Sequence, residues 1–209
     1  MRKAEIKRKT EEVDIQGGIV IDAEGKDVKG VIDTSIDFLN HLFTVFAFHG
    51  LLQLTLESKG DLKHHLLEDI GIGLGKSFKE ALGDCSGIRR FGYSYVVMET
   101  ALVRAVIDIS GRSFYKRDSL YNARVLPALD FSDTDNISWK DVDEFMKAFS
   151  ENAKLNIHLS YTYYSEQDGK GNAHHLLEAI FKAVGIALDQ ATQIDPRRKR
   201  IPSSKGVID

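Results

Sequence analysis

One pentapeptide occurs twice in this chain. Residues 64–68 and residues 174–178 both read HHLLE, so these two segments hold four of the seven histidines. The match continues beyond the pentapeptide at the same offset, since Gly75 corresponds to Gly185. Self-similarity at a fixed offset indicates one structural unit that is used twice. The chain is therefore expected to consist of two similar halves.

The segments before the two HHLLE copies are alike as well. Residues 36–50 place apolar side chains at helical spacing, and residues 51–58 then alternate apolar and polar, as a half-buried strand does. Residues 138–149 repeat the helical spacing, with a serine and an aspartate placed for a capping box, and residues 155–164 alternate again. Each half thus predicts a helix, a strand and a second helix that the paired histidines open.

The remaining segments are expected to be strands and loops. We expect a hairpin around residues 17–18 within residues 2–22, and two more strands in residues 91–109. Residues 116–137 and 164–172 are expected to be surface loops.

These elements predict an α+β protein that arose by internal duplication. Each half is expected to be a mostly antiparallel sheet with helices packed on one face. Residues 1–92 form the first predicted half-repeat and residues 93–209 the second. Because no linker rich in proline and serine divides them, we expect the two to share a core as one compact catalytic unit.

Composition narrows the class of function. The chain has 209 residues, a net charge of -3 and a pI of about 6.2, whereas nucleic-acid binders are usually basic. No apolar run approaches the ~20 residues of a bilayer-spanning helix, and the N-terminus lacks a signal-peptide stretch. The single cysteine, Cys85, excludes an internal disulfide and fits a reducing compartment. We therefore expect a cytoplasmic protein with no membrane or nucleic-acid partner.

The spacing within HHLLE suits the binding of metal ions. Successive helical residues point about 100° apart, so His64 and His65 cannot easily bind one ion together. His64 and Glu68, at positions i and i+4, share one face of the helix. The first histidine and the glutamate of each segment would then chelate one ion, and the second histidine would bind another ion. Imidazole and carboxylate ligands without thiolate suit manganese, iron or zinc.

Other motifs have simpler interpretations. His49 and His158 lie at or on the strand before each pair, where each faces either the site or the solvent. Residues 71–77, GIGLGKS, resemble a phosphate-binding loop, but Ile70 stands where that pattern requires glycine. We interpret the small residues of this segment as sites of close helix packing. The basic run at 197–200 is interpreted as a solvated tail or an anion site.

Six ordered motifs carry a resemblance to one enzyme family. They are FLNHLF with FHG, HHLLEDIGIGLG, GIRRFG, DISGRSFY, NAHHLLEAIFKA and DPRRKRIPSSKG. Along nearly its whole length the chain resembles imidazoleglycerol-phosphate dehydratase, in the form without a phosphatase domain. The resemblance implies a carbon–oxygen lyase of histidine biosynthesis that converts imidazole glycerol phosphate to imidazole acetol phosphate. It also implies a pair of Mn²⁺ ions in each active site, and a 24-subunit homo-oligomer with active sites at subunit interfaces.

The resemblance also assigns roles to individual residues. The family's manganese ligands are matched by His41, His64, His65, Glu68, His174, His175 and Glu178. Glu12 matches a glutamate close to the substrate, and His49 matches a histidine that lines the same pocket. The substrate and phosphate contacts are matched by Arg90, Arg112, Lys182, Ser203 and Lys205. We add His158 as a candidate substrate contact, whereas Arg90 and Arg112 have surface ion pairs as an alternative role.

The chain departs from the family pattern in a few positions. Asn40 stands where the family commonly has aspartate, and Lys63 stands where acidic residues commonly precede the first histidine pair, in a shorter loop. Glu144 stands where many members have a histidine ligand. Because carboxylate can replace imidazole on manganese, Glu144 is a candidate ligand, and its alternative role is a solvated helix position. The loops after Phe114 and before Gly171 are longer than usual.

The chemistry that the resemblance implies has a clear difficulty. The proton that must be removed has no carbonyl beside it. An imidazole held as its anion by two metals would instead supply the electrons that expel the hydroxyl. The acid–base candidates, in no firm order, are Glu12, His49, Glu68 and Glu178. Two other functions use the same ligands: a dinuclear hydrolase of a small phosphate ester, and a metal-storing or metal-sensing shell protein.

Overall fold

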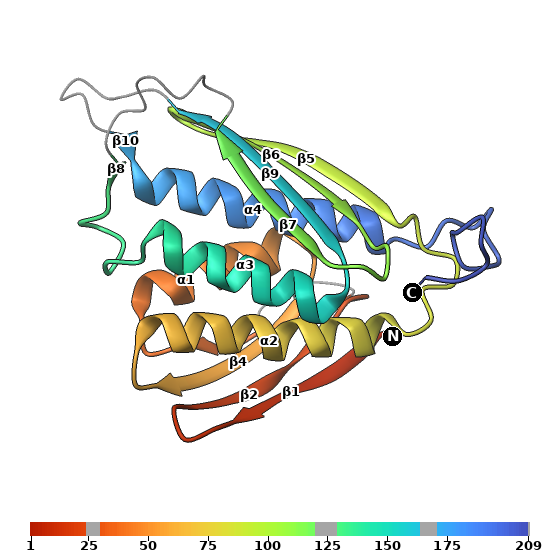
Figure 1. The fold of residues 1–209 in the computed structure, drawn as a ribbon, viewed down its shortest axis with the longest axis horizontal. Helices are drawn as coiled ribbons and strands as arrows, with labels where there is room; N and C mark the ends of the chain where they lie inside the picture. Colours follow the sequence, from red (N-terminus) through yellow and green to blue (C-terminus); the bar gives the residue numbers. More distant parts are fainter. Residues whose placement is uncertain (24–29, 120–128, 164–170, 209) are drawn as a thin grey trace.

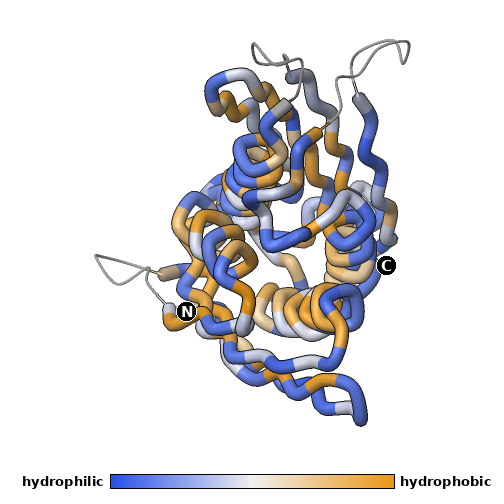
Figure 2. Tube along the Cα trace, turned by 90° about the vertical axis from the view of Figure 1, so that its left-hand side faces the viewer, coloured by the Kyte–Doolittle hydropathy of each residue, from blue (hydrophilic) through white to orange (hydrophobic). Residues whose placement is uncertain are grey.

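In the described part of the chain, four helices lie between two four-stranded β-sheets (Figure 1). The computed structural model describes residues 1–23, 30–119, 129–163 and 171–208. Figure 2 views the layers from the side and shows long hydrophobic stretches on the helices. The buried apolar side chains of the described residues form one continuous cluster that includes both sheets and all four helices. Side chains of both halves thus contribute to one hydrophobic cluster.

The two halves have the same order of elements and the same sheet topology. The four-stranded sheets have the orders β1-β2-β4-β3 and β5-β6-β9-β7, and in each the last strand pairs in parallel while the others are antiparallel. The first half consists of β1 Lys3–Lys9, β2 Val13–Val20, β3 Ile32–Asp33, α1 Asp37–His49, β4 Gln53–Gly60 and α2 Lys63–Leu82. The second consists of β5 Phe91–Met98, β6 Ala101–Asp108, β7 Phe114–Ser119, α3 Trp139–Ala153, β9 Asn156–Tyr163 and α4 Ala173–Thr192. A short parallel ladder joins β8 Leu129–Asp130 to β10 Gly171–Asn172.

The predicted helix limits agree with the structure. Ser138 and Asp141 form the capping box that starts α3, with Ser138 Oγ accepting a hydrogen bond from the Asp141 amide. Gly83 ends α2 in a conformation with a φ of 68°, which a glycine adopts without strain. The histidine pairs open α2 and α4, as the repeat predicts.

Two predictions about the strands are wrong. The first hairpin does not turn at Gly17 and Gly18, because both lie within β2 and the chain reverses between Lys9 and Val13. Gly17 instead allows β2 and β4 to approach each other closely, because a Cβ atom at this position would lie 2.0 Å from the Thr55 carbonyl oxygen. Residues 116–119 form the end of β7 rather than a loop, and the side chains of this strand alternate between exposed and half-buried. Residues 120–128 and 164–170 of the two predicted loops lie outside the described residues.

The first helix of each half packs against the other half. Helix α1 packs against α4 and α3 packs against α2, so the first helix of each half contacts the last helix of the other half. Glycines allow both contacts in equivalent positions. A Cβ at Gly75 would lie 2.8 Å from the Phe149 carbonyl oxygen, and one at Gly185 would lie 2.5 Å from that of Phe46. The prediction that the small residues of 71–77 permit close helix packing is confirmed, and this exchange brings residues of both halves into one site.

Candidate metal centre

Three of the predicted ligands converge where α1 meets the start of α4. The Nε2 atom of His41 lies 3.0 Å from Glu178 Oε2, and Nε2 of His174 lies 3.5 Å from the same oxygen. His174 and Glu178 share one face of α4 at i and i+4, whereas His41 comes from the other half of the chain. The ligand atoms of this triad all lie within 4.8 Å of one another, which is a spacing that one metal ion can bridge.

Buried polar atoms without hydrogen-bond partners indicate that this part of the fold suits a metal. Six such side-chain atoms occur among the described residues, and three of them belong to predicted ligands, namely His41 Nε2, Glu144 Oε2 and His175 Nδ1. The His41 atom is close to Glu178 but poorly aligned for a hydrogen bond. Because buried polar atoms are nearly always satisfied, His41 Nε2 and Glu144 Oε2 fit coordination of a cation, whereas His175 Nδ1 faces the Glu99 carboxylate at 3.2 Å.

The charge on Glu178 is maintained by its neighbours. Burial alone would raise the pKa of this carboxyl group, but Lys182 and His41 outweigh burial and lower it. Lys182 Nζ lies 2.6 Å from Oε1, while Oε2 faces the two histidines. Burial and then the positive charge of Lys182 lower the pKa of His49, against the smaller opposing influence of Glu178. Glu178 is therefore an ionised candidate ligand at neutral pH, and His49 is a neutral imidazole.

A second group forms at the start of α2. His65 Nδ1 lies 2.9 Å from Asp61 Oδ1 and 3.6 Å from Glu12 Oε2. The hydrogen bond to Asp61 is the main cause that raises the pKa of His65. His64 lies beside this group, its ring 4.2 Å from that of His65, and Glu68 is exposed one turn further along the helix. This group gathers a predicted ligand, a predicted substrate contact and one carboxylate that the sequence did not single out.

The remaining candidate ligands face neither of these groups directly. His175 Nδ1 lies 3.2 Å from Glu99 Oε2, at the turn between β5 and β6. Glu144 lies on α3 with Lys140 Nζ 3.7 Å from its Oε1 atom. Within the part of the chain that the structure describes, no metal-binding group combines residues of both HHLLE segments.

Arg90, which matches a phosphate contact, lies at the far end of α4. The backbone N–H of Arg90 donates to the carbonyl of Ala191 near the end of this helix, whereas His174 lies at its beginning. At 1.5 Å per residue the two positions are about 25 Å apart. Arg90 also pairs with Asp108 at 2.6 Å and donates to the carbonyl of Pro202 at 3.1 Å.

The other matched positions surround that end or lie apart from it. Ser203 is half-buried and its Oγ accepts the Lys205 amide at 3.2 Å, while the side chain of Lys205 is exposed. Arg112 is exposed between β6 and β7, and His158 is exposed on β9 with its ring stacked on Phe114. Lys182 is the exception, since it contacts the His41–Glu178 group directly.

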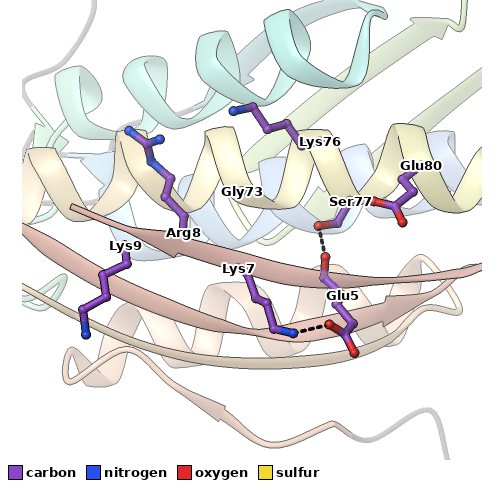
Figure 3. Close-up of a pocket in the computed structure, with 8 residues that line it drawn as sticks. All are labelled: Glu5, Lys7, Arg8, Lys9, Gly73, Lys76, Ser77 and Glu80. Carbon is purple, nitrogen blue, oxygen red and sulfur yellow. Dashed lines mark hydrogen bonds and ion pairs between the residues drawn. The ribbon is translucent and has the colours of Figure 1, made fainter.

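Another groove of about 590 Å³ lies between β1 and α2 but contains none of the predicted ligands (Figure 3). Two of its basic side chains are paired with carboxylates: Lys7 pairs with Glu5, and Arg8 Nε donates to Asp69 Oδ1 at 2.7 Å. Gly73 and its neighbours lie in the middle of a helix here, so residues 71–77 do not form a phosphate loop. In the described part of the chain, no helix is both long and apolar enough to cross a membrane.

Sequence reasoning missed three carboxylates that contact the predicted ligand histidines. They are Asp61 before α2, Glu99 in the β5–β6 turn and Asp133 before α3, whose Oδ2 atom lies 3.8 Å from His174 Nδ1. Only Asp61 had a usable signal, because it stands at i−4 of His65. The other two approach from distant segments, which no local pattern relates to the histidines.

Comparison with known proteins identifies the family to which the chain belongs. The family model described as imidazoleglycerol-phosphate dehydratase matches residues 34–188. The imidazoleglycerol-phosphate dehydratase of Thermoanaerobacter sp. (strain X514) is 44% identical over 211 residues, covering 100% of both chains. That of Geobacillus sp. (strain WCH70) is 40% identical over the same length and coverage.

Solved structures agree in fold as well as in sequence. The crystal structure of IGPD from Pyrococcus furiosus in complex with (S)-C348 is similar with a TM-score of 0.77 at 34% identity, covering 96% of this chain and 98% of that one. The imidazoleglycerol-phosphate dehydratase of Staphylococcus aureus gives a TM-score of 0.72 at 32% identity, covering 92% and 99%. The chain belongs to the imidazoleglycerol-phosphate dehydratase family, which comprises carbon–oxygen lyases of histidine biosynthesis.

Proposed function

We propose that this protein removes water from imidazole glycerol phosphate to give imidazole acetol phosphate, with a pair of manganese ions in each active site. We propose further that each site is assembled from more than one copy of the chain within a homo-oligomer. Family membership supports the reaction class. The incomplete ligand groups and their distance from the phosphate contacts support the manganese pair and the shared site.

The separation along α4 is the observation that carries this proposal. His174 and Arg90 are about 25 Å apart at opposite ends of one helix, which is too far for one small substrate to reach both. A substrate that is held by the metals at one end of its glycerol chain and by cations at the phosphate therefore needs a second copy. Closed symmetric assemblies provide such a junction many times over, because every copy presents both surfaces.

The internal duplication supports Glu144 as a ligand in this scheme. Glu144 occupies the position on α3 that His41 occupies on α1, just as His64 and Glu68 correspond to His174 and Glu178. The buried, unpartnered Oε2 atom of Glu144 then becomes the counterpart of the unpartnered Nε2 atom of His41. Carboxylate and imidazole are both suitable ligands of manganese.

The protein's own groups have defined tasks in this reaction. When bound, the metals would supply Lewis acidity that favours loss of the hydroxyl group. Lys182 Nζ holds one oxygen of Glu178, while the other faces His41 and His174, which with it would hold an ion. His49 is neutral at pH 7 because its pKa is lowered, so it can accept a proton, and Glu12 offers an exposed carboxylate beside His65. Arg90 and Lys205 bind the phosphate through charge-assisted hydrogen bonds.

Product analysis tests the reaction against its two alternatives. Incubation of the purified protein with Mn²⁺ and imidazole glycerol phosphate is expected to yield a ketone without free phosphate. Release of inorganic phosphate would support a dinuclear hydrolase instead. Metal uptake with neither product would support a storage or sensing protein. The control is protein stripped of metal by a chelator, which is expected to be inactive until Mn²⁺ is restored.

Complementation between two inactive variants tests the shared site. His174→Ala removes a ligand and Lys205→Ala removes a phosphate contact, and each homo-oligomer is expected to be nearly inactive. If the two groups of one site come from different copies, half of the copies supply each intact group in a one-to-one co-assembly. About a quarter of the sites then regain both groups, and activity returns to about a quarter of the wild-type value.

The matched control for complementation combines His174→Ala with Glu178→Gln. Both changes lie on the same face of the same helix, so no mixed site regains a complete group and activity stays at the background level. Recovery in this control, or none with Lys205→Ala, would contradict a site that is divided as proposed.

A further inference from the structure

Three predicted ligand histidines share one feature of orientation. In each of them Nδ1 faces a carboxylate that is not itself a predicted ligand. The distances are 2.9 Å from His65 to Asp61, 3.2 Å from His175 to Glu99, and 3.8 Å from His174 to Asp133. The three carboxylates come from the start of α2, the β5–β6 turn and the segment before α3. Only the Asp61–His65 pair is local in sequence, so local sequence does not explain the orientation that the three share.

The same orientation leaves Nε2 as the ligand atom in these rings. Nε2 of His174 already faces Glu178, its partner in the candidate triad, at 3.5 Å. In His175 the buried Nδ1 atom lies 3.2 Å from Glu99 Oε2, which leaves Nε2 as the nitrogen available to an ion. A histidine that binds a metal through one nitrogen usually donates the N–H of the other to a carboxylate, which fixes its tautomer and makes it a stronger ligand.

Two of the carboxylates have structural features that do not depend on a metal. Asp61 Oδ1 also accepts the N–H of Leu62 at 2.6 Å, which fixes this side chain at the helix start. Glu99 lies in a tight turn with a φ of 47°, a value that non-glycine residues seldom adopt. Such backbone strain persists where the surrounding structure imposes it, and it is frequent at functional sites.

We propose that Asp61 and Glu99 are positioning residues, which accept the Nδ1–H of His65 and His175 and thereby commit Nε2 of each ring to the metals. Asp133 lies 3.8 Å from His174 Nδ1, beyond hydrogen-bond distance, and acts on that ring through its charge. This inference rests on the proposed metal function and adds to it a second layer of residues. None of the three carboxylates needs to touch an ion or the substrate. Their effect is on how tightly the ions are held.

Manganese affinity, measured by competition with a chelator, tests this inference. Asp61→Asn and Glu99→Gln keep the shape of the side chain but remove its charge, so each is expected to weaken Mn²⁺ binding by about 10–100-fold. The conservative variant Glu99→Asp keeps a carboxylate and is expected to recover most of the loss. The matched control is Glu57→Gln, an exposed carboxylate on β4 that pairs with Gln16 Nε2 and is expected to leave the affinity unchanged.

Two measurements separate this inference from the proposed function. Wild-type protein that binds no Mn²⁺ would overturn the proposed function itself. Wild-type protein that binds Mn²⁺, with both neutral variants within about twofold of it, would overturn only the positioning role. The thermal unfolding of the metal-free variants is expected to match that of the metal-free wild type. A marked loss of metal-free stability would show that the carboxylates are structural and would also overturn the inference.

Discussion

A chain that carries both His64→Ala and His174→Ala is expected to lose its tightly bound manganese and its dehydratase activity. The double change removes the first histidine of each HHLLE segment, and with it the chelation by histidine and glutamate at i and i+4. We expect Mn²⁺ binding to weaken by at least about 100-fold, since loss of a group that only orients a ligand already costs 10–100-fold. Turnover at fixed Mn²⁺ is expected to fall at least as much.

Metal analysis of the dialysed protein measures this effect, and His158→Ala is its control. His158 is exposed on β9 and stacks on Phe114, so its removal leaves every predicted ligand in place. The control is expected to keep the metal content of the wild type. A double variant that still holds two tightly bound ions per chain would show that the ligand assignment is wrong.

Replacement of Phe43 by alanine is expected to give the largest loss of stability of any single change considered. Phe43 is fully buried on α1, and its ring packs edge-on against Phe145 of α3 and Phe181 of α4. The distances between ring centroids are 5.1 Å and 5.8 Å. These contacts join helices of both halves. Truncation of a buried phenylalanine leaves a cavity and costs about 3–5 kcal/mol in the free energy of unfolding.

Chemical denaturation of the metal-free protein checks this value, with Phe48→Ala on the same helix as the control. Phe48 is 58% exposed, so its truncation is expected to change the free energy of unfolding by no more than about 0.5 kcal/mol. Equal losses in the two variants would contradict the assignment of Phe43 to a core that both halves share. Because His41 lies on the same helix, Phe43→Ala is also expected to weaken metal binding.

The fold was largely predictable because duplication repeats its signals. The periodicity of the helices, the Ser138–Asp141 capping box and the Gly83 terminus follow from local physical chemistry, and the structure agrees with each. The misplaced first hairpin has a specific cause. Glycine in a sequence indicates either a turn or a close approach of two backbones. At Gly17 it is the close approach, because the Thr55 carbonyl leaves no room for a Cβ atom. Strand β7 was missed because its polar, half-exposed residues resemble a loop.

The candidate site was predictable only in part. The repeat indicates which residue types bind metal, but it does not indicate that α1 packs on the helix of the other half and brings His41 to Glu178. Nor does it reveal Glu99 and Asp133, since acidic residues in turns have no periodic signal. The distance between the ligands and the phosphate contacts emerges only from the folded chain, because it depends on the length and direction of α4.

Anomalous diffraction at the manganese edge, from crystals of the metal-loaded oligomer, tests most directly whether the two HHLLE segments act together. We predict pairs of manganese ions, with His64 or His65 of one copy and His174 or His175 of another among the ligands of each pair. Manganese ions that each bind a single HHLLE segment, far from the other segment of any copy, would contradict this account.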